Sequence, residues 1–404
     1  IEPATIPALV NEAVANMWAG RIRPVEVEVP PDTLFASEEV ALLGGVERPA
    51  RSAGDPDVIE RAAKLLGNAK NPLFFVGGGV IGAGATAELQ ELAEMLQAPV
   101  MMTPNGKGAI SYRHYLAQTL MSTRELIADA DVIFAIGTRF LEASTQPWGP
   151  KGSRTVIQLD IDPEEIGRNT PVTVGIEADA RAGLSALVER VAVHNSSRPS
   201  REAELTALRT AAEAKIDAIQ PQSGFAHAIR AELPDDGIFV GEMTQIAYWS
   251  GIGFPVYEPR TYFTPGYQGT LGWGYPTSLG VKVGASDKVV VSVNGDGGFG
   301  FALNELATQA HHGIASITLV FNDSAYGNVR RIQNVEFNGR TIASELHNPD
   351  YVKLAESFGV TGRQATTPAG LRTQLAESIK ADEPTLIEIP VEAMPDPWKI
   401  LSIR

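Results

Sequence analysis

The sequence contains no cysteine among its 404 residues, which excludes disulfides, thiolate nucleophiles and cysteine-ligated zinc. Clusters of basic residues are also missing, because 33 Lys and Arg face 48 Asp and Glu and the formal net charge is −15. Nucleic acid and anionic membranes require clustered positive charge in a partner, so we expect neither to bind. The longest apolar runs, such as 317–321, fall far below the ~18 residues of a membrane span. We therefore expect a soluble, cytoplasmic protein.

The order of apolar segments predicts an α/β protein with two doubly wound parallel-sheet domains, a central one and a C-terminal one. Short continuous apolar runs alternate with helical patterns from about residue 58 onward, as in the strands of a parallel sheet that is covered on both faces. The predicted strands are 73–76, 100–102, 132–136 and 156–159, followed by 238–240, 289–293, 317–321 and 386–389.

Stretches rich in Pro, Gly and Ser indicate the domain boundaries. We predict a linker over 36–57, a central α/β domain over 58–192, a second linker over 193–220 and a C-terminal domain over 221–404. Residues 1–35 show a helical pattern and then a predicted strand over 21–29, which is too little to form a core. Because the sequence starts with Ile1 inside that helical pattern, we expect further material upstream.

One stretch of the C-terminal domain has the features of a site for a metal and a diphosphate. Strand 289–293 leads into Gly295-Asp296-Gly297-Gly298, and strand 317–321 leads into Asn322-Asp323. Ligands of an open parallel sheet bind beyond the carboxyl ends of its strands, so these oxygens would face one crevice. Oxygen ligands suit Mg²⁺, which takes one or two from the protein and the rest from phosphates and water. The glycines allow close backbone approach, and the next helix offers free N–H groups to a diphosphate.

This pattern resembles the thiamine-diphosphate (ThDP) motif of the 2-oxo acid decarboxylase and acetolactate synthase family. The shared features are Gly295-Asp296-Gly297, Glu305-Leu306-Ala307-Thr308 and Gly313. The resemblance implies that Mg²⁺ is bound by Asp296, by the Asp323 side chain and by the backbone carbonyl of Ala325. Tyr326 and Gly327 follow in the same motif and are expected to contact the cofactor.

Two residues depart from the family pattern. Gly298 stands where a Ser is usual, and Asp323 stands where an Asn is usual. Asn322 therefore stays open as the alternative metal ligand. An interpretation without a ligand is also available, because Gly-Asp-Gly can be a tight turn and Asn-Asp a helix cap.

The segment Gly269-Thr270-Leu271-Gly272-Trp273-Gly274-Tyr275-Pro276 resembles a second motif of the same family. By that resemblance Gly269 and Thr270 contact the cofactor, the Gly269 carbonyl accepting from its aminopyrimidine. Leu271 is implied to be a hydrophobic wedge under the bent cofactor, and ordinary core packing is its alternative role. The segment 241–249 resembles the stretch over the cofactor's reactive face, where Thr244 and Gln245 could meet a ligand.

One segment of the central domain resembles the glycine motif of dinucleotide-binding proteins. Gly77, Gly79 and Gly82 fit Gly-x-Gly-x-x-Gly between a strand and a helix, but no acid closes the next strand, where Met101-Met102-Thr103 stands. The ribose contact of a NAD site is therefore missing. The domain also looks like the family's central domain, which in some members carries FAD or ADP. We favour a purely structural role for it here.

The resemblance implies ThDP- and Mg²⁺-dependent decarboxylation of a 2-oxo acid, with or without carboligation as in acetolactate synthase. A 2-hydroxyacyl-CoA lyase or an aromatic 2-oxo acid decarboxylase is the alternative within the class. The family's activating Glu lies in a pyrimidine-binding domain of which residues 1–35 resemble only the closing remnant, so no catalytic residue is assignable in this chain. Because the family's site is shared between subunits, a homodimer or homotetramer is implied.

A non-catalytic, nucleotide-binding relative is the alternative from another class. Asp323 and the lack of a pyrimidine-binding domain favour that alternative, whereas Gly295-Asp296-Gly297 and Gly269-Thr270 oppose it. No Gly-x-Ser-x-Gly elbow occurs, so a hydrolase has no support.

Overall fold

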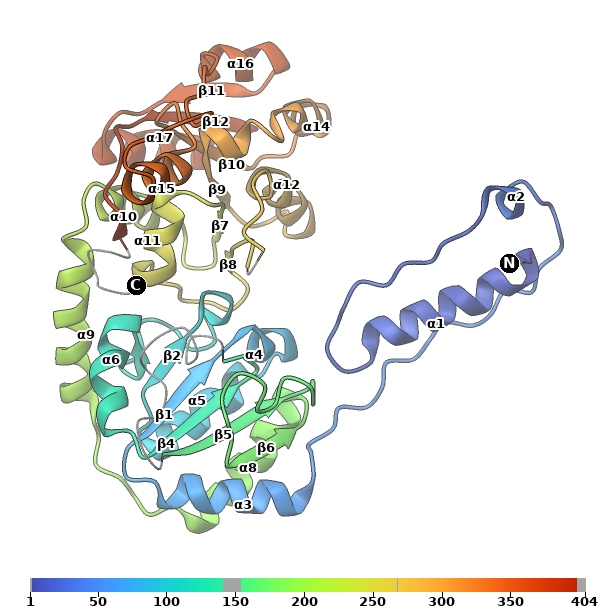
Figure 1. The fold of residues 1–404 in the computed structure, drawn as a ribbon, viewed down its shortest axis with the longest axis vertical. Coiled ribbons are helices and arrows are strands. Elements are labelled where there is room, and N and C mark those ends of the chain that lie inside the picture. The colour runs from blue at the N-terminus through green and yellow to red at the C-terminus, as the bar shows by residue number, and fades with distance from the viewer. Residues whose placement is uncertain (1, 141–153, 267, 398–404) are drawn as a thin grey trace.

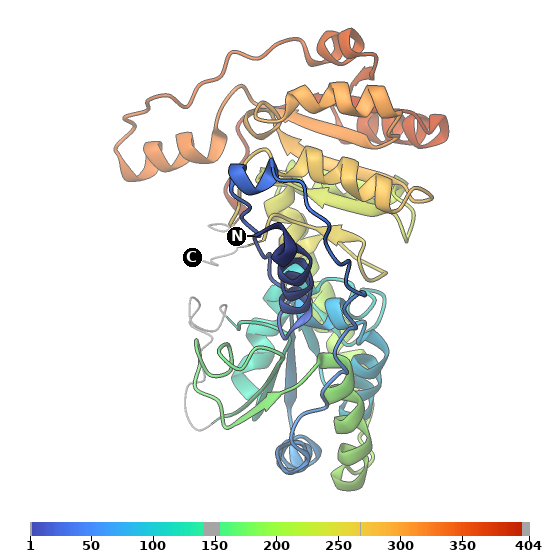
Figure 2. The ribbon, with the colours of Figure 1, turned by 90° about the vertical axis from the view of Figure 1, so that its right-hand side faces the viewer.

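The computed structural model describes residues 2–140, 154–266 and 268–397. Two α/β units are stacked along the long axis of the molecule, and the N-terminal segment, drawn in dark blue, forms an arm that projects from them (Figures 1 and 2). Each unit is built on a six-stranded sheet in which the paired strands are parallel. The expected fold class, α/β with two doubly wound parallel sheets, is confirmed.

The first sheet has the strand order β3-β2-β1-β4-β5-β6. Its strands are β1 (Pro72–Val76), β2 (Val100–Met102), β3 (Ala117–Gln118), β4 (Val132–Ile136), β5 (Thr155–Asp160) and β6 (Val174–Glu177). One face packs against α3 (Pro56–Asn68), α4 (Gly78–Ala83), α5 (Thr86–Leu96) and α8 (Ala180–His194). The other face packs against α6 (Leu120–Asp129), and η2 (Pro104–Gly106) follows β2.

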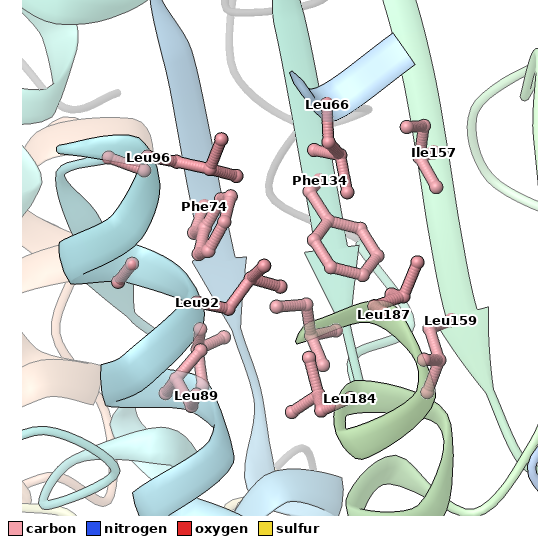
Figure 3. Close-up of a cluster of buried hydrophobic side chains, with 14 of the residues drawn as sticks. Leu66, Phe74, Leu89, Leu92, Leu96, Phe134, Ile157, Leu159, Leu184 and Leu187 are labelled. Carbon is pink, nitrogen blue, oxygen red and sulfur yellow. The ribbon is translucent and has the colours of Figure 1, made fainter. Parts of the chain in front are cut away.

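Burial on both faces explains why the inner strands β1 and β4 of this sheet are continuous apolar runs. In β1, Phe74 and Val76 belong to one core cluster, whereas Leu73 and Phe75 belong to the cluster on the opposite face. Figure 3 shows Phe74 and Phe134 packed against the leucines of α5 and α8. Successive side chains of a strand point to opposite faces, so a strand covered on both faces favours apolar residues at consecutive positions.

The second sheet has the order β11-β12-β10-β9-β7-β8. Its strands are β7 (Ile238–Gly241), β8 (Tyr262–Phe263), β9 (Val290–Gly295), β10 (Ile317–Asn322), β11 (Thr361–Gln364) and β12 (Thr385–Pro390). Helices α10 (Gln222–Glu232), α11 (Gln245–Gly253) and α17 (Pro368–Ala381) contribute to the core on one face. The core on the other face includes α12 (Gly274–Gly284), α13 (Asp296–Phe299), α14 (Leu306–His312) and α16 (Tyr351–Phe358). The short η3 (Leu303–Glu305) precedes α14, and α15 (Gly327–Glu336) follows β10.

Helix α9 (Glu202–Asp217) connects the two units, and it occupies most of the predicted linker 193–220. Its Leu205 belongs to the core of the first unit, and its Ile216 belongs to the core of the second. The guanidinium of Arg209 donates to the carbonyls of Tyr112, His114 and Ala117 at 2.8–3.0 Å. The connection between the units is therefore a packed helix, while the exact domain boundaries stay a prediction.

The arm contains η1 (Pro3–Thr5), α1 (Ile6–Trp18) and α2 (Pro31–Leu34). The strand predicted over 21–29 is wrong, because these residues pair with no strand among those described. Ile22 is 78% exposed, and Val25 and Val27 are also exposed. The alternation of apolar residues is present, but a strand also needs a neighbour to accept its backbone hydrogen bonds. Within the described ranges, no helix combines the length and apolarity needed to cross a membrane.

Candidate functional site

Two acidic side chains converge where β9 and β10 end. Asp296 follows β9 directly and is 3% exposed, and Asp323 follows β10, whose Phe321 pairs in parallel register with Gly295. The backbone of Ala325 lowers the pKa of both carboxylates, and the charge of Asp323 raises the pKa of Asp296. The two strand ends therefore present their oxygens to one place, as the crevice rule for parallel sheets requires.

The pKa values of Asp296 and Asp323 are those expected of two buried acids that lie close together. Burial raises the pKa of Asp296, a hydrogen bond from Asn348 lowers it, and the nearby Asp323 charge raises it again. Burial also raises the pKa of Asp323, which Arg330 lowers. The Nη2 atom of Arg330 lies 3.5 Å from Oδ2 of Asp323. A divalent cation between the two acids would remove the cost of burying both charges.

The side chain of Asn322 belongs to a hydrogen-bond network instead. Its Nδ2 donates to Oε1 of Glu388 at 2.8 Å, and its Oδ1 accepts from the amide of Ser324 at 3.1 Å. Oε2 of the same Glu388 accepts from Gln364 at 3.1 Å. Both polar ends of Asn322 are thus engaged by protein, whereas Asp323 lies with Asp296.

Sequence reasoning missed Asn348, which connects the two strand ends. Its Nδ2 donates to Oδ2 of Asp296 at 2.6 Å and to Oδ1 of Asn322 at 2.9 Å. Asn348 lies in the loop before α16 and stands in His347-Asn348-Pro349, a pattern typical of a turn. No spacing in the sequence could have connected it with Asp296.

A loop carrying the second predicted motif lies beside this pair of strand ends. Gly269 and Gly272 both have left-handed backbone, with φ of +58° and +77°, which glycine adopts without steric cost. Leu271 is 36% exposed, so the core-packing alternative for Leu271 is wrong. Thr270 precedes it in the same loop. Glu242, for which no role was predicted from the sequence, accepts hydrogen bonds from the amides of Gly272 and Gly274.

The segment after β7 has mostly structural contacts. Thr244 caps α11, its Oγ1 accepting from the amide of Ala247 at 3.1 Å. Trp249 is fully buried and donates from its ring nitrogen to the Ile216 carbonyl at 3.0 Å. Met243 lies against the loop, because a Cβ on Gly269 would come within 3.1 Å of its methyl carbon. The predicted cofactor contact of Thr244 stays a prediction.

The glycines of the central unit are used for packing between two loops. A Cβ on Gly77 would overlap the carbonyl oxygen of Gly137, and a Cβ on Gly79 would lie 2.7 Å from the Gly137 Cα. The amide of Gly79 donates to the Gly137 carbonyl at 3.0 Å. A Cβ on Gly82 meets nothing within 4 Å. Gly77 and Gly79 are therefore explained by the close approach of the loops after β1 and β4.

A cavity of about 980 Å³ lies over the carboxyl edge of the first sheet. Gly77 and Asn105 from the central unit, Met243 and Thr264 from the C-terminal unit and Arg21 from the arm all contribute to its lining. The cavity thus joins all three parts of the chain.

The residues at the ends of β9 and β10 fit a metal–diphosphate group. No group of three His, Cys, Asp or Glu that could enclose a metal occurs in the part of the chain that the structure describes. Two carboxylates are what Mg²⁺ uses when phosphates and water supply its remaining ligands.

Comparison with known proteins agrees with this geometry. The family model "Thiamine pyrophosphate enzyme, C-terminal TPP binding domain" matches residues 242–389. The model "Thiamine pyrophosphate enzyme, central domain" matches residues 59–187. Together with the relatives below, which align with 94–98% of this chain, these matches show that the chain belongs to the thiamine pyrophosphate enzymes, the family that the sequence motifs indicated.

Three relatives illustrate the range of the family. A probable acetolactate synthase large subunit of Methanococcus aeolicus is 30% identical, over 98% of this chain and 71% of the relative. A probable sulfoacetaldehyde acetyltransferase of Rhizobium meliloti (strain 1021) is 31% identical, over 94% of this chain and 70% of the relative. A probable 2-ketoarginine decarboxylase of Pseudomonas aeruginosa is 31% identical, over 96% and 70%. Relatives of similar identity thus carry names for different substrates.

Proposed function

We propose that the protein is a ThDP- and Mg²⁺-dependent enzyme that decarboxylates a 2-oxo acid, with or without joining the product to an acceptor. The observation that carries this proposal is the placement of Asp296 and Asp323 at the ends of neighbouring parallel strands, where the charge of Asp323 raises the pKa of Asp296. Membership of the thiamine pyrophosphate enzymes supports the cofactor, and acetolactate synthases among the relatives support the substrate class.

The metal would be held by Asp296, by the Asp323 side chain and by the backbone carbonyl of Ala325. We prefer Asp323 to Asn322 because both polar ends of the Asn322 side chain are already hydrogen-bonded. The backbone of Gly295, Gly297 and Gly298 would lie against the diphosphate beside the metal, and Tyr326 and Gly327 would close the same side. Arg330 offsets the charge that Asp323 adds relative to the usual Asn.

ThDP, when bound, would supply the nucleophilic and electron-accepting chemistry that loss of CO₂ from a 2-oxo acid requires. The chain's own residues orient that group. The Gly269 carbonyl would accept a hydrogen bond from the aminopyrimidine, and Leu271 would support the ring system from below. The exposure of Leu271 supports this role, because its side chain is free to contact a ligand. Holding the reacting groups in one geometry is the main contribution that a protein makes to such chemistry.

We further propose that the central unit has a structural role and holds neither FAD nor ADP. The support is that Gly77 and Gly79 are accounted for by packing against Gly137, although the adjoining cavity of about 980 Å³ has room for a ligand. Release of a flavin or adenine nucleotide from the purified, denatured protein would contradict this proposal.

The assembly proposed is a cytoplasmic homodimer or homotetramer, since the family's site is shared between subunits. Light scattering in solution tests the number of subunits. A monomer that turns over substrate would contradict the proposed assembly.

The experiment that tests the activity is incubation of the protein with ThDP, Mg²⁺ and either pyruvate or benzoylformate, followed by product identification. Acetolactate from pyruvate indicates a carboligase, and benzaldehyde from benzoylformate indicates an aromatic decarboxylase. A protein that binds ThDP and releases CO₂ from no 2-oxo acid would instead support the non-catalytic alternative.

A further inference from the structure

Glu242 is a buried carboxylate to which the proposed function assigns no task. It follows β7 directly and is 1% exposed. Its Oε1 accepts from the amide of Gly272 at 2.8 Å, and its Oε2 accepts from the amide of Gly274 at 2.9 Å. The first amide belongs to the loop that carries Gly269 and Leu271, and the second belongs to the first residue of α12, where that loop ends. One side chain directly after β7 therefore holds the end of that loop at two points.

Gly298 leaves the space that this carboxylate fills. A Cβ on Gly298 would overlap Oε1 of Glu242, and a Cβ on Gly274 would lie 2.8 Å from the Glu242 Cβ. Gly298 lies in α13, two residues after Asp296. The departure of Gly298 from the family's usual Ser thus has a steric reason, because a larger residue at 298 cannot lie beside Glu242 in this position.

We infer that Glu242 is a positioning residue that sets the separation between the two halves of the cofactor site. The inference rests on the proposed function, which assigns loop 269–274 to the aminopyrimidine and segment 295–298 to the diphosphate. Glu242 hydrogen-bonds to the first and packs against the second, so its position determines how far apart they lie. A rigid spacing matters because the cofactor must be bent before its reacting groups meet.

The chemistry of the carboxylate is essential to this role. An ionised carboxylate has only acceptor sites and can take one backbone N–H on each oxygen. An amide in its place has one acceptor oxygen, and its NH₂ group would face the second backbone N–H. Glu242→Gln therefore keeps the size of the side chain and removes one of the two attachments of the loop.

The two halves of the site can be tested separately by calorimetric titration with excess Mg²⁺. ThDP probes the whole site, and inorganic pyrophosphate probes the diphosphate half alone. Glu242→Gln should raise the Kd of ThDP about tenfold or more, the usual effect of losing a hydrogen bond to a charged group. It should leave the Kd of pyrophosphate unchanged. The matched control is Asp131→Asn, because Asp131 also accepts from two backbone amides, those of Lys70 and Asn71 at 2.7 and 2.8 Å, but in the central unit. This control should change neither Kd.

A second comparison needs no ligand and tests whether Glu242 packs against Gly298. Gly298→Ser should lower the Tm, and Glu242→Ala in the Gly298→Ser background should recover part of the loss, since the smaller side chain vacates the space. Additive losses in the double variant would overturn the inference. The inference would also be overturned if Glu242→Gln bound ThDP as tightly as the wild type, or if its affinities for ThDP and pyrophosphate fell equally. The proposed function would stand in either case. A wild-type protein that binds no ThDP would overturn both.

Discussion

Asn348 donates a hydrogen bond of 2.6 Å to Asp296, from which it is separated by 52 residues. The same nitrogen lies 2.9 Å from Oδ1 of Asn322, which belongs to the neighbouring strand end. Asn348 therefore orients one proposed metal ligand and supports the residue that precedes the other. Hydrogen bonds from surrounding residues commonly fix the orientation of carboxylates that bind metals.

Asn348→Ala should weaken Mg²⁺-dependent binding of ThDP. The loss should be about 10- to 100-fold, the range typical for residues that orient metal ligands. Titration of the apoprotein with ThDP at fixed Mg²⁺ checks this expectation. Asn304→Ala is a suitable control, because the exposed side chain of Asn304 hydrogen-bonds to its neighbour Glu305. An unchanged Kd in Asn348→Ala would show that Asp296 needs no partner.

Arg330 should strengthen the binding of ThDP, because it offsets the negative charge of Asp323. Arg330→Met should weaken ThDP binding by about 1 kcal/mol, the scale of a partly exposed ion pair. Asp323→Asn in the same background should recover that loss, because the net charge at the site returns to its original value. The four proteins of this double-mutant cycle can be compared by calorimetry. Equal losses from Arg330→Met with Asp or Asn at 323 would contradict the pairing.

The two kinds of glycine in the central unit should respond differently to alanine. Gly77→Ala should destabilise the protein by about 1–3 kcal/mol, because its Cβ would overlap the Gly137 carbonyl. Gly82→Ala should instead stabilise it by about 0.5–1 kcal/mol, because Gly82 lies inside α4 with open space around it. Denaturant unfolding measures both changes. Similar stabilities for the two variants would refute the packing explanation of the motif.

Lys107 should make the stability of the protein depend on pH. Its Nζ donates to the Phe254 carbonyl at 2.9 Å, and burial lowers its pKa to about 7. Above that pH the native state holds a neutral lysine while the unfolded chain still binds the proton. The free energy of unfolding should therefore rise by about 1.4 kcal/mol per pH unit from about pH 7 toward the unfolded pKa near 10.4, and it should show no such slope below pH 7.

Lys107→Met should remove this contribution to the slope. Lys215→Met, at an exposed lysine of α9, should retain it. Unfolding of the three proteins at about pH 7 and about pH 9 is sufficient for the comparison. Parallel pH dependence of Lys107→Met and the wild type would contradict a lysine that is neutral in the folded protein.

The strands that the sequence did not predict are the four edge strands of the two sheets. Strands β3 and β8 have two residues each, and β6 and β11 have four. An inner strand of a parallel sheet is buried on both faces and reads as an apolar run. An edge strand such as β11, with the sequence Thr-Gly-Arg-Gln and little burial, lacks that signal. All eight inner strands were predicted because they carry it.

The residues of the site also divide into those that the sequence could predict and those that it could not. Asp296 and Asp323 follow apolar runs directly, so the topology of a parallel sheet brings them together. Asn348 and Glu242 act through contacts that exist only after the loops pack on the strand ends. The strand predicted over 21–29 failed for the opposite reason, because its alternation is present but its partner strand is not among the described residues.

The most direct test of the account is calorimetric titration of ThDP into the metal-free and the Mg²⁺-loaded protein, with Asp296→Ala beside the wild type. The control is Asp287→Ala, at an exposed turn before β9. We predict that wild type and Asp287→Ala bind ThDP only with Mg²⁺, and that Asp296→Ala binds it in neither condition. Equal ThDP affinity of Asp296→Ala and the wild type in the presence of Mg²⁺ would contradict the central claim that the ends of β9 and β10 hold a metal and its diphosphate.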